Sequence, residues 1–540
     1  MGSRHTLLGS ALALVCAALL PAAAAAATAA TAAATTATAA DDASRRIAID
    51  LNAPTVARDR FADLSVGSDY PGTLIRDDSL AQLKLAQAEL GFRYIRFHGI
   101  FHDVLGTYKV VDGKPVYDWT RIDYLYDKLL GMGIKPFVEL GFTPEAMKTS
   151  NNSIFYWKGN TSHPDHAQWG SLVDAFVRHL QQRYGRDEVR TWFFEVWNEP
   201  NLDGFWEKAD QPAYFALYDL SARTIKAIDP QLRVGGPSTA GAAWVPEFLA
   251  HTRASGAAVD FITTHTYGVD GGFLDENGKD DTRLSASKDA IVGDVRKVRR
   301  EIDASYLPRL PLYFTEWSTS YTPRDPVHDA YVSAAYILDK LKGSEGLLQG
   351  MSYWTYSDLF EEPGPPTAPF EGGFGLMNPH GIRKPAWFAY KYLHQLGERQ
   401  LPTADAQSWV TRDDKGGVQV LAWDFRTPEQ GKRSNRPFYT KVQPTRDGAP
   451  LTLELKGLKA GTCAMQLYRT GFRANDAHTA YLEMGKPKTL TAAQVAQLQG
   501  LTADRPETRQ VRVGRDGSAK VTVPMRVNDV VLVKIGAARP

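Results

Sequence analysis

Residues 191–199 read TWFFEVWNE, a short run of aromatic and β-branched residues that ends at a carboxylate and is followed by Pro200. Such a run is typical of a buried strand, and proline stops strand pairing at its end. Longer segments, with apolar residues at helical spacing, separate this run from others like it. The other runs are 61–67, 93–98, 135–140, 233–239, 261–268, 311–318 and 350–358. Eight alternating strands and helices predict an α/β protein with a (β/α)8 TIM barrel.

The barrel is predicted over residues 57–398. Its predicted helices include 79–89, 119–132, 166–184, 212–228, 287–302, 327–342 and 384–396. Beyond residue 399 apolar and polar residues alternate, and Gly, Pro and Asp separate the runs. A period of two is typical of half-buried strands, so residues 399–540 are predicted to form an accessory antiparallel β-sandwich. The early strand-like segment within 45–56 is predicted to join that sandwich.

The N-terminus has the residue order of an export signal. Arg4 and His5 precede a mostly apolar run, and Pro21 and several alanines follow it. The run is about fourteen residues long, shorter than the ~20 that a membrane-spanning helix needs. Residues 1–27 are therefore predicted to be a signal peptide, and the Ala- and Thr-rich residues 28–44 a flexible leader. We expect a secreted or periplasmic protein without a membrane anchor after cleavage.

Composition argues against a charged partner. The chain has 62 Lys and Arg against 61 Asp and Glu, a net charge of +1, so nothing favours binding to nucleic acid. An aromatic content of 11% suits a protein that stacks on sugar rings. Of its two cysteines only Cys463 remains after signal cleavage, so no internal disulfide is expected. No Cys and His set has zinc spacing, and neither a metal nor a cofactor is predicted.

Two glutamates stand at the ends of predicted barrel strands. Glu199 ends the fourth run, in the context Asn-Glu-Pro, and Glu316 lies near the end of the seventh, in the context Thr-Glu-Trp. Either alone could be a salt-bridge or capping residue. The C-terminal ends of barrel strands meet at one face, where active sites of this fold lie. Two carboxyl groups facing each other there are typical of glycoside hydrolysis.

Residues 90–390 resemble family 39 of the glycoside hydrolases, the β-xylosidase and α-L-iduronidase family. The resemblance rests on short motifs spread over most of the barrel. They are Arg96-Phe97-His98-Gly99, the segments 136–142 and 155–160, Trp197-Asn198-Glu199-Pro200, Thr264-His265-Thr266-Tyr267, Thr315-Glu316-Trp317, and the segments 352–358 and 374–376.

The resemblance implies a retaining mechanism with Glu199 as general acid/base and Glu316 as nucleophile. Arg96 is two residues before His98, so both side chains point to one side of the strand, where Arg96 is expected to support Glu316. The resemblance also implies a set of substrate-binding residues. They are His98, Asn198, His265, Tyr267 and Trp354, together with Phe142, Tyr321, Glu361 and Glu362.

The activity implied is that of an exo-acting xylan 1,4-β-xylosidase, which releases β-1,4-linked xylose from xylo-oligosaccharides. Other family members remain as alternatives, namely an α-L-iduronidase, a β-glucosidase or an arabinosidase. An iduronidase would need a cation near its sugar carboxylate, and Lys158, Arg324 and Arg383 are the candidates. A non-catalytic carbohydrate-binding protein is the alternative from another class. The presence of both Glu199 and Glu316 favours an enzyme over that alternative.

Overall fold

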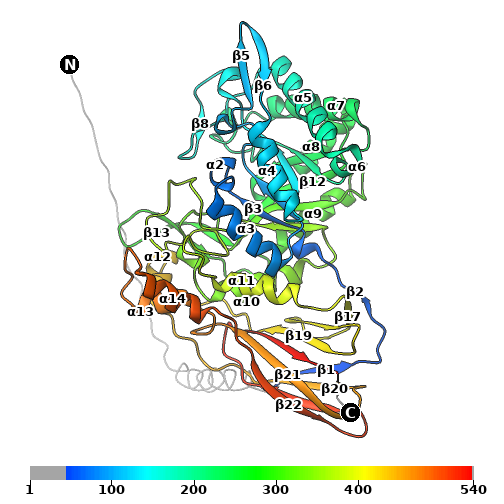
Figure 1. The fold of residues 1–540 in the computed structure, drawn as a ribbon, viewed down its shortest axis with the longest axis vertical. Coiled ribbons are helices and arrows are strands. Elements are labelled where there is room, and N and C mark those ends of the chain that lie inside the picture. Colours follow the sequence, from blue (N-terminus) through cyan, green and yellow to red (C-terminus); the bar gives the residue numbers. More distant parts are fainter. Residues whose placement is uncertain (1–43, 538–540) are drawn as a thin grey trace, which may run out of the picture.

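The structure, a computed structural model, describes residues 44–537 (Figure 1). The signal peptide predicted over 1–27 and all but the last residue of the predicted leader lie outside the described residues. Within 44–537, no helix combines the length and the apolar character needed to cross a membrane. In Figure 1 a barrel surrounded by helices occupies the upper part of the molecule, and β-sheets lie below it.

Eight parallel strands form a closed barrel, and the predicted (β/α)8 architecture is confirmed. Each barrel strand pairs with the next barrel strand in the sequence, and the last, β16, pairs with the first, β3. The barrel strands are β3 (Ser65–Ser68), β4 (Tyr94–Phe97), β7 (Lys135–Leu140), β10 (Phe193–Val196), β11 (Arg233–Thr239), β12 (Phe261–Tyr267), β15 (Leu312–Ser318) and β16 (Gly350–Tyr353).

Several strands are shorter than their sequence runs predict, and β3 and β16 show where the missing residues go. The run 61–67 begins with a 3-10 turn, Phe61–Asp63, and only its end belongs to β3. The run 350–358 leaves the sheet after Tyr353. Phe61 and Tyr356 are nevertheless buried, packed in the main core. An apolar run in the sequence indicates buried residues, and tightly packed loop residues form such a run as readily as strand residues do.

Helices of the barrel follow most of the strands. Most of them bury one apolar face, whereas the last two, α10 and α11, are buried on nearly every side. In α5 the buried residues recur at helical spacing, from Trp169 to Leu180. Helix α8 is not among the predicted helices, and the predicted helix 327–342 starts with a 3-10 turn, Pro326–His328, before α10. The longer helices are α3 (Asp77–Leu90), α4 (Thr120–Gly131), α5 (His166–Tyr184), α7 (Gln211–Ile228), α8 (Val245–Ser255), α9 (Val292–Asp303), α10 (Val332–Ser344) and α11 (Pro385–His394), and the short ones are α2 (Pro71–Leu74) and α6 (Arg186–Val189).

The C-terminal residues form two packed sheets. The larger has the order β2-β17-β18-β19-β24-β21-β22 and the smaller the order β1-β20-β23. The early strand β1 lies in the smaller sheet but pairs in parallel with β20, so the predicted all-antiparallel pairing is wrong there. These strands are β1 (Arg45–Asp50), β2 (Val56–Ala57), β17 (Arg399–Leu401), β18 (Ser408–Arg412), β19 (Val418–Trp423), β20 (Leu451–Lys456), β21 (Gly461–Thr470), β22 (Glu507–Val513), β23 (Ala519–Val523) and β24 (Val530–Ile535). Three short helices, α12 (Asn435–Tyr439), α13 (Ala477–Glu483) and α14 (Ala492–Leu501), accompany them.

The larger sheet packs against the barrel. Alternate residues of β19 face opposite ways, so Val420 joins the core between the two sheets, whereas Leu421 and Trp423 join the barrel core. The Trp409 indole also donates to the Glu345 carboxylate at the end of α10, at 3.1 Å. Because β19 is buried on both faces, the two units share a continuous apolar interface beside α10 and α11 (Figure 1).

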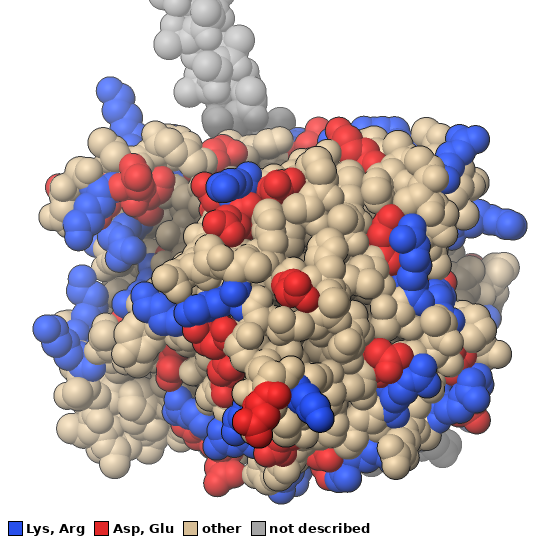
Figure 2. Space-filling model, turned by 90° about the horizontal axis from the view of Figure 1, so that it is seen from above, with Lys and Arg blue, Asp and Glu red and all other residues tan. Residues whose placement is uncertain are grey.

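Charges of both signs are mixed on the surface. On the face shown in Figure 2, Lys and Arg side chains alternate with Asp and Glu side chains, and neither sign forms a continuous area. This mixture agrees with the net charge of +1.

An aromatic layer fills the barrel interior near the N-terminal ends of the strands, and we call it the aromatic floor. Phe137, Phe193, Phe261 and Tyr313 project inward from four strands and contact one another, with Phe137 and Phe193 stacked at 4.5 Å. The next inward residue of a strand lies two positions further on. The polar groups at those positions therefore rest on an apolar floor and are open only toward the C-terminal end of the barrel.

Candidate active site

A buried arginine organises the layer above the aromatic floor. Arg96 on β4 is fully buried, and its Nε donates to Glu195 Oε2 at 2.8 Å. Its Nη2 lies 3.0 Å from Glu139 Oε2 and donates to Asn198 Oδ1 at 2.8 Å, while Nη1 donates to Glu316. Burial by itself would lower the pKa of Arg96, but the three carboxylates outweigh it and raise the pKa. One guanidinium thus balances carboxylates from three other strands.

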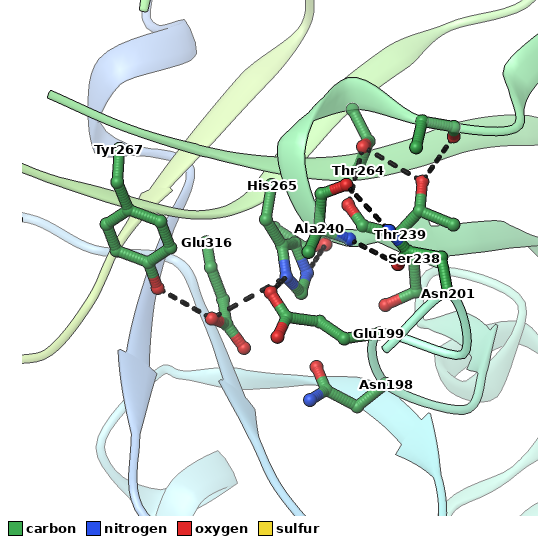
Figure 3. Close-up of polar contacts among 12 residues, drawn as sticks. Asn198, Glu199, Asn201, Ser238, Thr239, Ala240, Thr264, His265, Tyr267 and Glu316 are labelled. Carbon is green, nitrogen blue, oxygen red and sulfur yellow. Dashed lines mark hydrogen bonds and ion pairs between the residues drawn. The ribbon is translucent and has the colours of Figure 1, made fainter. Parts of the chain in front are cut away.

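The two predicted catalytic carboxyl groups face each other above Arg96. One oxygen of Glu199, one of Glu316 and one nitrogen of His265 all lie within 4.8 Å of one another. Figure 3 shows the side chain of Glu199 between His265 and Asn198, directed toward Glu316. Retaining glycosidases have carboxyl groups ~5–5.5 Å apart, and inverting ones ~6.5–9.5 Å apart. The short separation fits the retaining geometry.

Glu199 sits on a strained turn after β10. Trp197 has φ 71° and Glu199 has φ 47°, and such positive φ values cost of order 1–3 kcal/mol each in residues other than glycine. The turn is held by main-chain bonds, from Trp197 N to Leu140 O at 3.0 Å and from Glu199 N to Ser238 O at 2.8 Å. The surrounding barrel strands therefore impose the direction in which the Glu199 carboxyl group points.

Burial raises the pKa of Glu199 to about 7, against the opposing charges of His98 and Arg96. A carboxyl group that keeps its proton near neutral pH is suited to act as a general acid. Glu316 has a different environment, because Arg96 donates to Oε1 and the Tyr267 hydroxyl donates to Oε2 at 2.7 Å. The two glutamates thus have the unequal surroundings that an acid and a nucleophile require.

A bulge in β15 brings Glu316 to the interior. Thr264 pairs with Phe314 and His265 pairs with Glu316, so Thr315 has no partner on β12 in that ladder. A strand with strict alternation would turn Glu316 away if Tyr313 and Thr315 faced inward. The irregular register re-aims the side chain, as bulges near active sites do. Thr315 and Glu316 both face the site as a result.

His98 is held between two further carboxyl groups. Its Nδ1 lies 2.7 Å from Glu139 Oε2, and its Nε2 lies 3.1 Å from Glu362 Oε1. Burial would lower the pKa of His98, but Glu139 and Glu362 outweigh it and raise the pKa well above its usual value. Burial raises the pKa of Glu362 to about 8. At neutral pH this corner of the site thus holds an imidazolium and a protonated carboxyl group.

A cavity of about 510 Å³ lies over the two glutamates. Most of the residues predicted from the sequence line it. They are His98, Asn198, Glu199, Tyr267, Glu316, Tyr321, Trp354 and Glu362. Tyr321 stands at the mouth, half exposed, with its ring edge-to-face with Tyr267.

Three predicted substrate-binding residues do not reach this lining. His265 is fully buried behind Glu199 and contacts it rather than the cavity. Phe142 is buried and packs on Trp157, so its ring supports the wall from behind. The Glu361 side chain turns outward to Arg76, at 3.1 Å. Arg96, predicted to support Glu316, lies beneath the cavity and contacts Glu316 directly.

Several residues at the site are not among those predicted from the sequence. Glu139 and Glu195 are charged residues inside otherwise apolar strands, which is the signal that could have identified them. Asp69, at the end of the first strand, accepts from Trp157 Nε1 at 3.0 Å and from Glu361 N at 2.8 Å. Leu202 and Phe205 line the cavity beside Glu199, and no pattern in the sequence distinguishes them.

The site does not have the charge balance of a cation site. Glu199, His265 and Glu316 are close enough to share an ion, but the Arg96 guanidinium already contacts Glu316 and Glu199 has a raised pKa. An added cation would have to displace a proton and compete with a buried guanidinium. These charges instead leave one protonated carboxyl group and one group bonded to a guanidinium, an arrangement suited to acid/base and nucleophilic chemistry.

Comparison with known proteins agrees with the resemblance seen in the motifs. The family described as "Glycosyl hydrolases family 39" matches residues 45–519. The chain is 35% identical over 501 residues to a beta-xylosidase from Geobacillus stearothermophilus, which covers 91% of this chain and 96% of that protein. Human alpha-L-iduronidase is 24% identical over 502 residues, covering 83% of this chain and 71% of that protein.

Solved structures show a close match over most of the chain. A GH39 enzyme from Xanthomonas axonopodis pv. citri has 64% identity and a TM-score of 0.90, with 92% of this chain and 98% of that chain covered. A monomeric beta-xylosidase from Caulobacter crescentus has 66% identity and a TM-score of 0.90, with 92% and 100% covered.

The role of Arg96 leads to a stability prediction. Arg96→Met should lower the free energy of unfolding by ~3–5 kcal/mol, because carboxylates that stay buried lose their cation. Denaturant titration followed by fluorescence measures the change. The control is Arg178→Met, which removes an exposed ion pair to Asp174 at 2.9 Å and should leave the unfolding midpoint unchanged. Equal midpoints for the two variants would contradict the organising role of Arg96.

Proposed function

The chain belongs to family 39 of the glycosyl hydrolases, and from that membership and the geometry of its site we propose that it is a retaining β-xylosidase. The observation that carries the proposal is the approach of Glu199 and Glu316 to within 4.8 Å across one cavity. Its xylosidase relatives and the unequal surroundings of the two carboxyl groups support it. The presence of both groups also argues against a non-catalytic carbohydrate-binding protein.

The proposed reaction proceeds by double displacement. Glu316 attacks the anomeric carbon while Glu199 protonates the departing oxygen, which gives a covalent glycosyl-enzyme. Asn198, whose Oδ1 is held by Arg96, has an amide nitrogen without a partner among the described residues. That amide can donate to a sugar hydroxyl next to the reacting carbon. Glu199, now a carboxylate, then takes a proton from the water that releases the sugar.

The charges around the cavity favour a neutral sugar. Among its lining residues, all within 44–537, none is Lys or Arg, and the cationic His98 is already held between Glu139 and Glu362. The three candidate cations for a uronic acid are engaged elsewhere or do not line the cavity. Arg383 pairs with Glu89, Arg324 donates to Gly364 O at 3.0 Å, and Lys158 is not part of the lining. These placements support xylose or another neutral sugar over iduronate.

An apolar wall supports a small pyranose. Trp354, Phe360 and Phe374 pack together, with Tyr267 against them, and Trp354 and Phe374 line the cavity. Xylose carries no hydroxymethyl group at C5, so it can lie against such a wall without leaving a polar group unpartnered. We therefore propose exo-release of xylose from the ends of xylo-oligosaccharides.

Removal of each carboxyl group tests the assignment. Glu316→Ala should abolish release of nitrophenol from nitrophenyl β-xyloside, because no nucleophile remains. Glu199→Ala should slow xylobiose hydrolysis by about 10²–10⁴-fold yet spare glycosylation by activated aryl xylosides, whose leaving groups need no proton. Azide should partly restore its turnover.

Glu188→Ala is the matched control, because this glutamate lies in α6 (Arg186–Val189), ahead of β10, does not line the cavity and pairs with Lys135. It should retain full activity. Equal losses on both substrates in Glu199→Ala would rule out the acid/base role, and wild-type protein inert toward every β-xyloside would rule out the function.

The pH profile should report the Glu199 proton. With a pKa of about 7, the acid is present below that pH and is lost as the pH rises through it. For xylobiose, kcat/KM should fall about tenfold for each pH unit above that pKa, which forms the basic limb of the profile. A dinitrophenyl xyloside, which needs no acid, should show a weaker basic limb. Identical basic limbs for the two substrates would contradict this assignment.

We propose also that the protein is exported, a view supported by the residue order of positions 1–27. When the full chain is expressed in a bacterial host, the mature protein should be recovered from the periplasm or the medium. N-terminal sequencing should then place its first residue between the apolar run and Arg45. Recovery of uncleaved protein only in the cytoplasm would refute export.

A further inference from the structure

A chain of hydrogen-bonding groups connects the two catalytic glutamates beneath the cavity. His265 Nδ1 lies 2.8 Å from Glu199 Oε1, a contact visible in Figure 3, and its Nε2 lies 3.2 Å from Thr315 Oγ1. Thr315 Oγ1 in turn lies 2.7 Å from Glu195 Oε1. Glu195 Oε2 accepts from Arg96 Nε at 2.8 Å, and Arg96 also donates to the nucleophile. The residues between the two glutamates are all buried.

The direction of these hydrogen bonds can be assigned from Glu195. Burial would raise the pKa of Glu195, but the charge of Arg96 outweighs it and lowers the pKa. Glu195 is therefore a carboxylate, which only accepts. The hydroxyl hydrogen of Thr315 must point to Glu195, so the Thr315 oxygen can only accept from the imidazole. His265 therefore carries its hydrogen on Nε2.

The same reasoning extends to the catalytic acid. Burial lowers the pKa of His265 to about 4, so the ring is neutral at neutral pH. A neutral imidazole with hydrogen on Nε2 has a bare Nδ1. A carboxylate oxygen 2.8 Å from that nitrogen would place two acceptors against each other. The contact is favourable only when Glu199 carries the hydrogen and donates it to Nδ1.

We propose that Glu195 and Thr315 are positioning residues that hold His265 in its Nε2–H form, whose bare Nδ1 keeps the catalytic proton on Glu199. The inference rests on the proposed function only in taking Glu199 as the acid/base. It adds a way in which the barrel interior sets the protonation state of that residue. Neither Glu195 nor Thr315 lines the cavity.

The network serves both halves of the reaction. In the first, the Glu199 proton passes to the glycosidic oxygen as the bond from that oxygen to the anomeric carbon breaks. The Glu199 carboxylate then faces a bare Nδ1, which disfavours the anion. In the second, the carboxylate takes a proton from water as the water oxygen bonds to the anomeric carbon and the Glu316 ester bond breaks. The network therefore makes Glu199 a stronger base when a base is needed.

Other charged groups also act on Glu199. Arg96 on β4 and His98 directly after it lower its pKa, and Glu139 on β7 raises it. Glu316 on β15 lies within 4.8 Å of Glu199, and its Oε2 lies 3.6 Å from His265 Nδ1. A change at Thr315 leaves every one of these charges in place, because the hydroxyl is neutral. Its effect on the Glu199 proton can therefore be separated from theirs.

The test is the basic limb of the pH profile in Thr315→Val. Without the hydroxyl, His265 is free to move its hydrogen to Nδ1 and donate to the Glu199 carboxylate, which favours the anion. The basic limb of kcat/KM for xylobiose should move to lower pH by about one unit, a tenfold change in the proton equilibrium. Thr315→Ser keeps a hydroxyl and should restore the wild-type limb.

The matched control is Thr264→Val. Thr264 is the residue before His265, is equally buried, and its hydroxyl bonds to Thr239 on β11 rather than to the network (Figure 3). The basic limb of Thr264→Val should coincide with that of wild type even if the variant has a lower free energy of unfolding. A wild-type limb in Thr315→Val, or the same shift in Thr264→Val, would overturn the proposal.

A second measurement needs no catalytic turnover. In wild-type protein labelled with ¹⁵N-histidine, the His265 signal is identified by its loss in His265→Asn. Its ring shifts should show a protonated Nε2 and a bare Nδ1 at pH 6. A ring protonated at Nδ1 would refute the inference even if xylosidase activity is present. Inactive wild-type protein with the predicted tautomer would instead refute only the proposed function.

Discussion

One guanidinium buried among three carboxylates is the constraint on which the catalytic face of the barrel depends. Taking a carboxylate out of water costs several kcal/mol unless a cation and hydrogen bonds compensate it. The aromatic layer below offers no polar partner, so Glu139, Glu195 and Glu316 must all be satisfied by Arg96 and by the polar groups at their own level. The positions of the nucleophile and of its neighbours follow from that requirement.

The same requirement gives the two catalytic glutamates different properties. Glu316 receives a direct bond from Arg96, whereas Glu199 meets a neutral imidazole and retains a raised pKa. An enzyme that needs one charged and one protonated carboxyl group a few ångströms apart must give the two groups different surroundings, so that their pKa values differ. Here the separation comes from which strand each residue occupies and from the bulge that turns Thr315 and Glu316 to the same side.

Much of the fold could be predicted because strands and helices have their own sequence periods. The eight barrel strands and the sheets after residue 399 have patterns that depend on neighbours in sequence, and these predictions hold. The predictions that differ involve longer distances. Phe61 and Tyr356 are buried without strand pairing, and β1 meets β20 in parallel, because packing partners far along the chain decide those features.

The sequence by itself determined that Glu199 and Glu316 stand at strand ends on one barrel rim, since strand order and the C-terminal position of the loops follow from the βα repeat. Only the tertiary structure decided what surrounds them. Arg96, Glu139, Glu195 and Thr315 come from four strands, and their contacts depend on the register between those strands. A single-residue shift of register turns a side chain to the opposite face, and no local pattern of residues reveals such a shift.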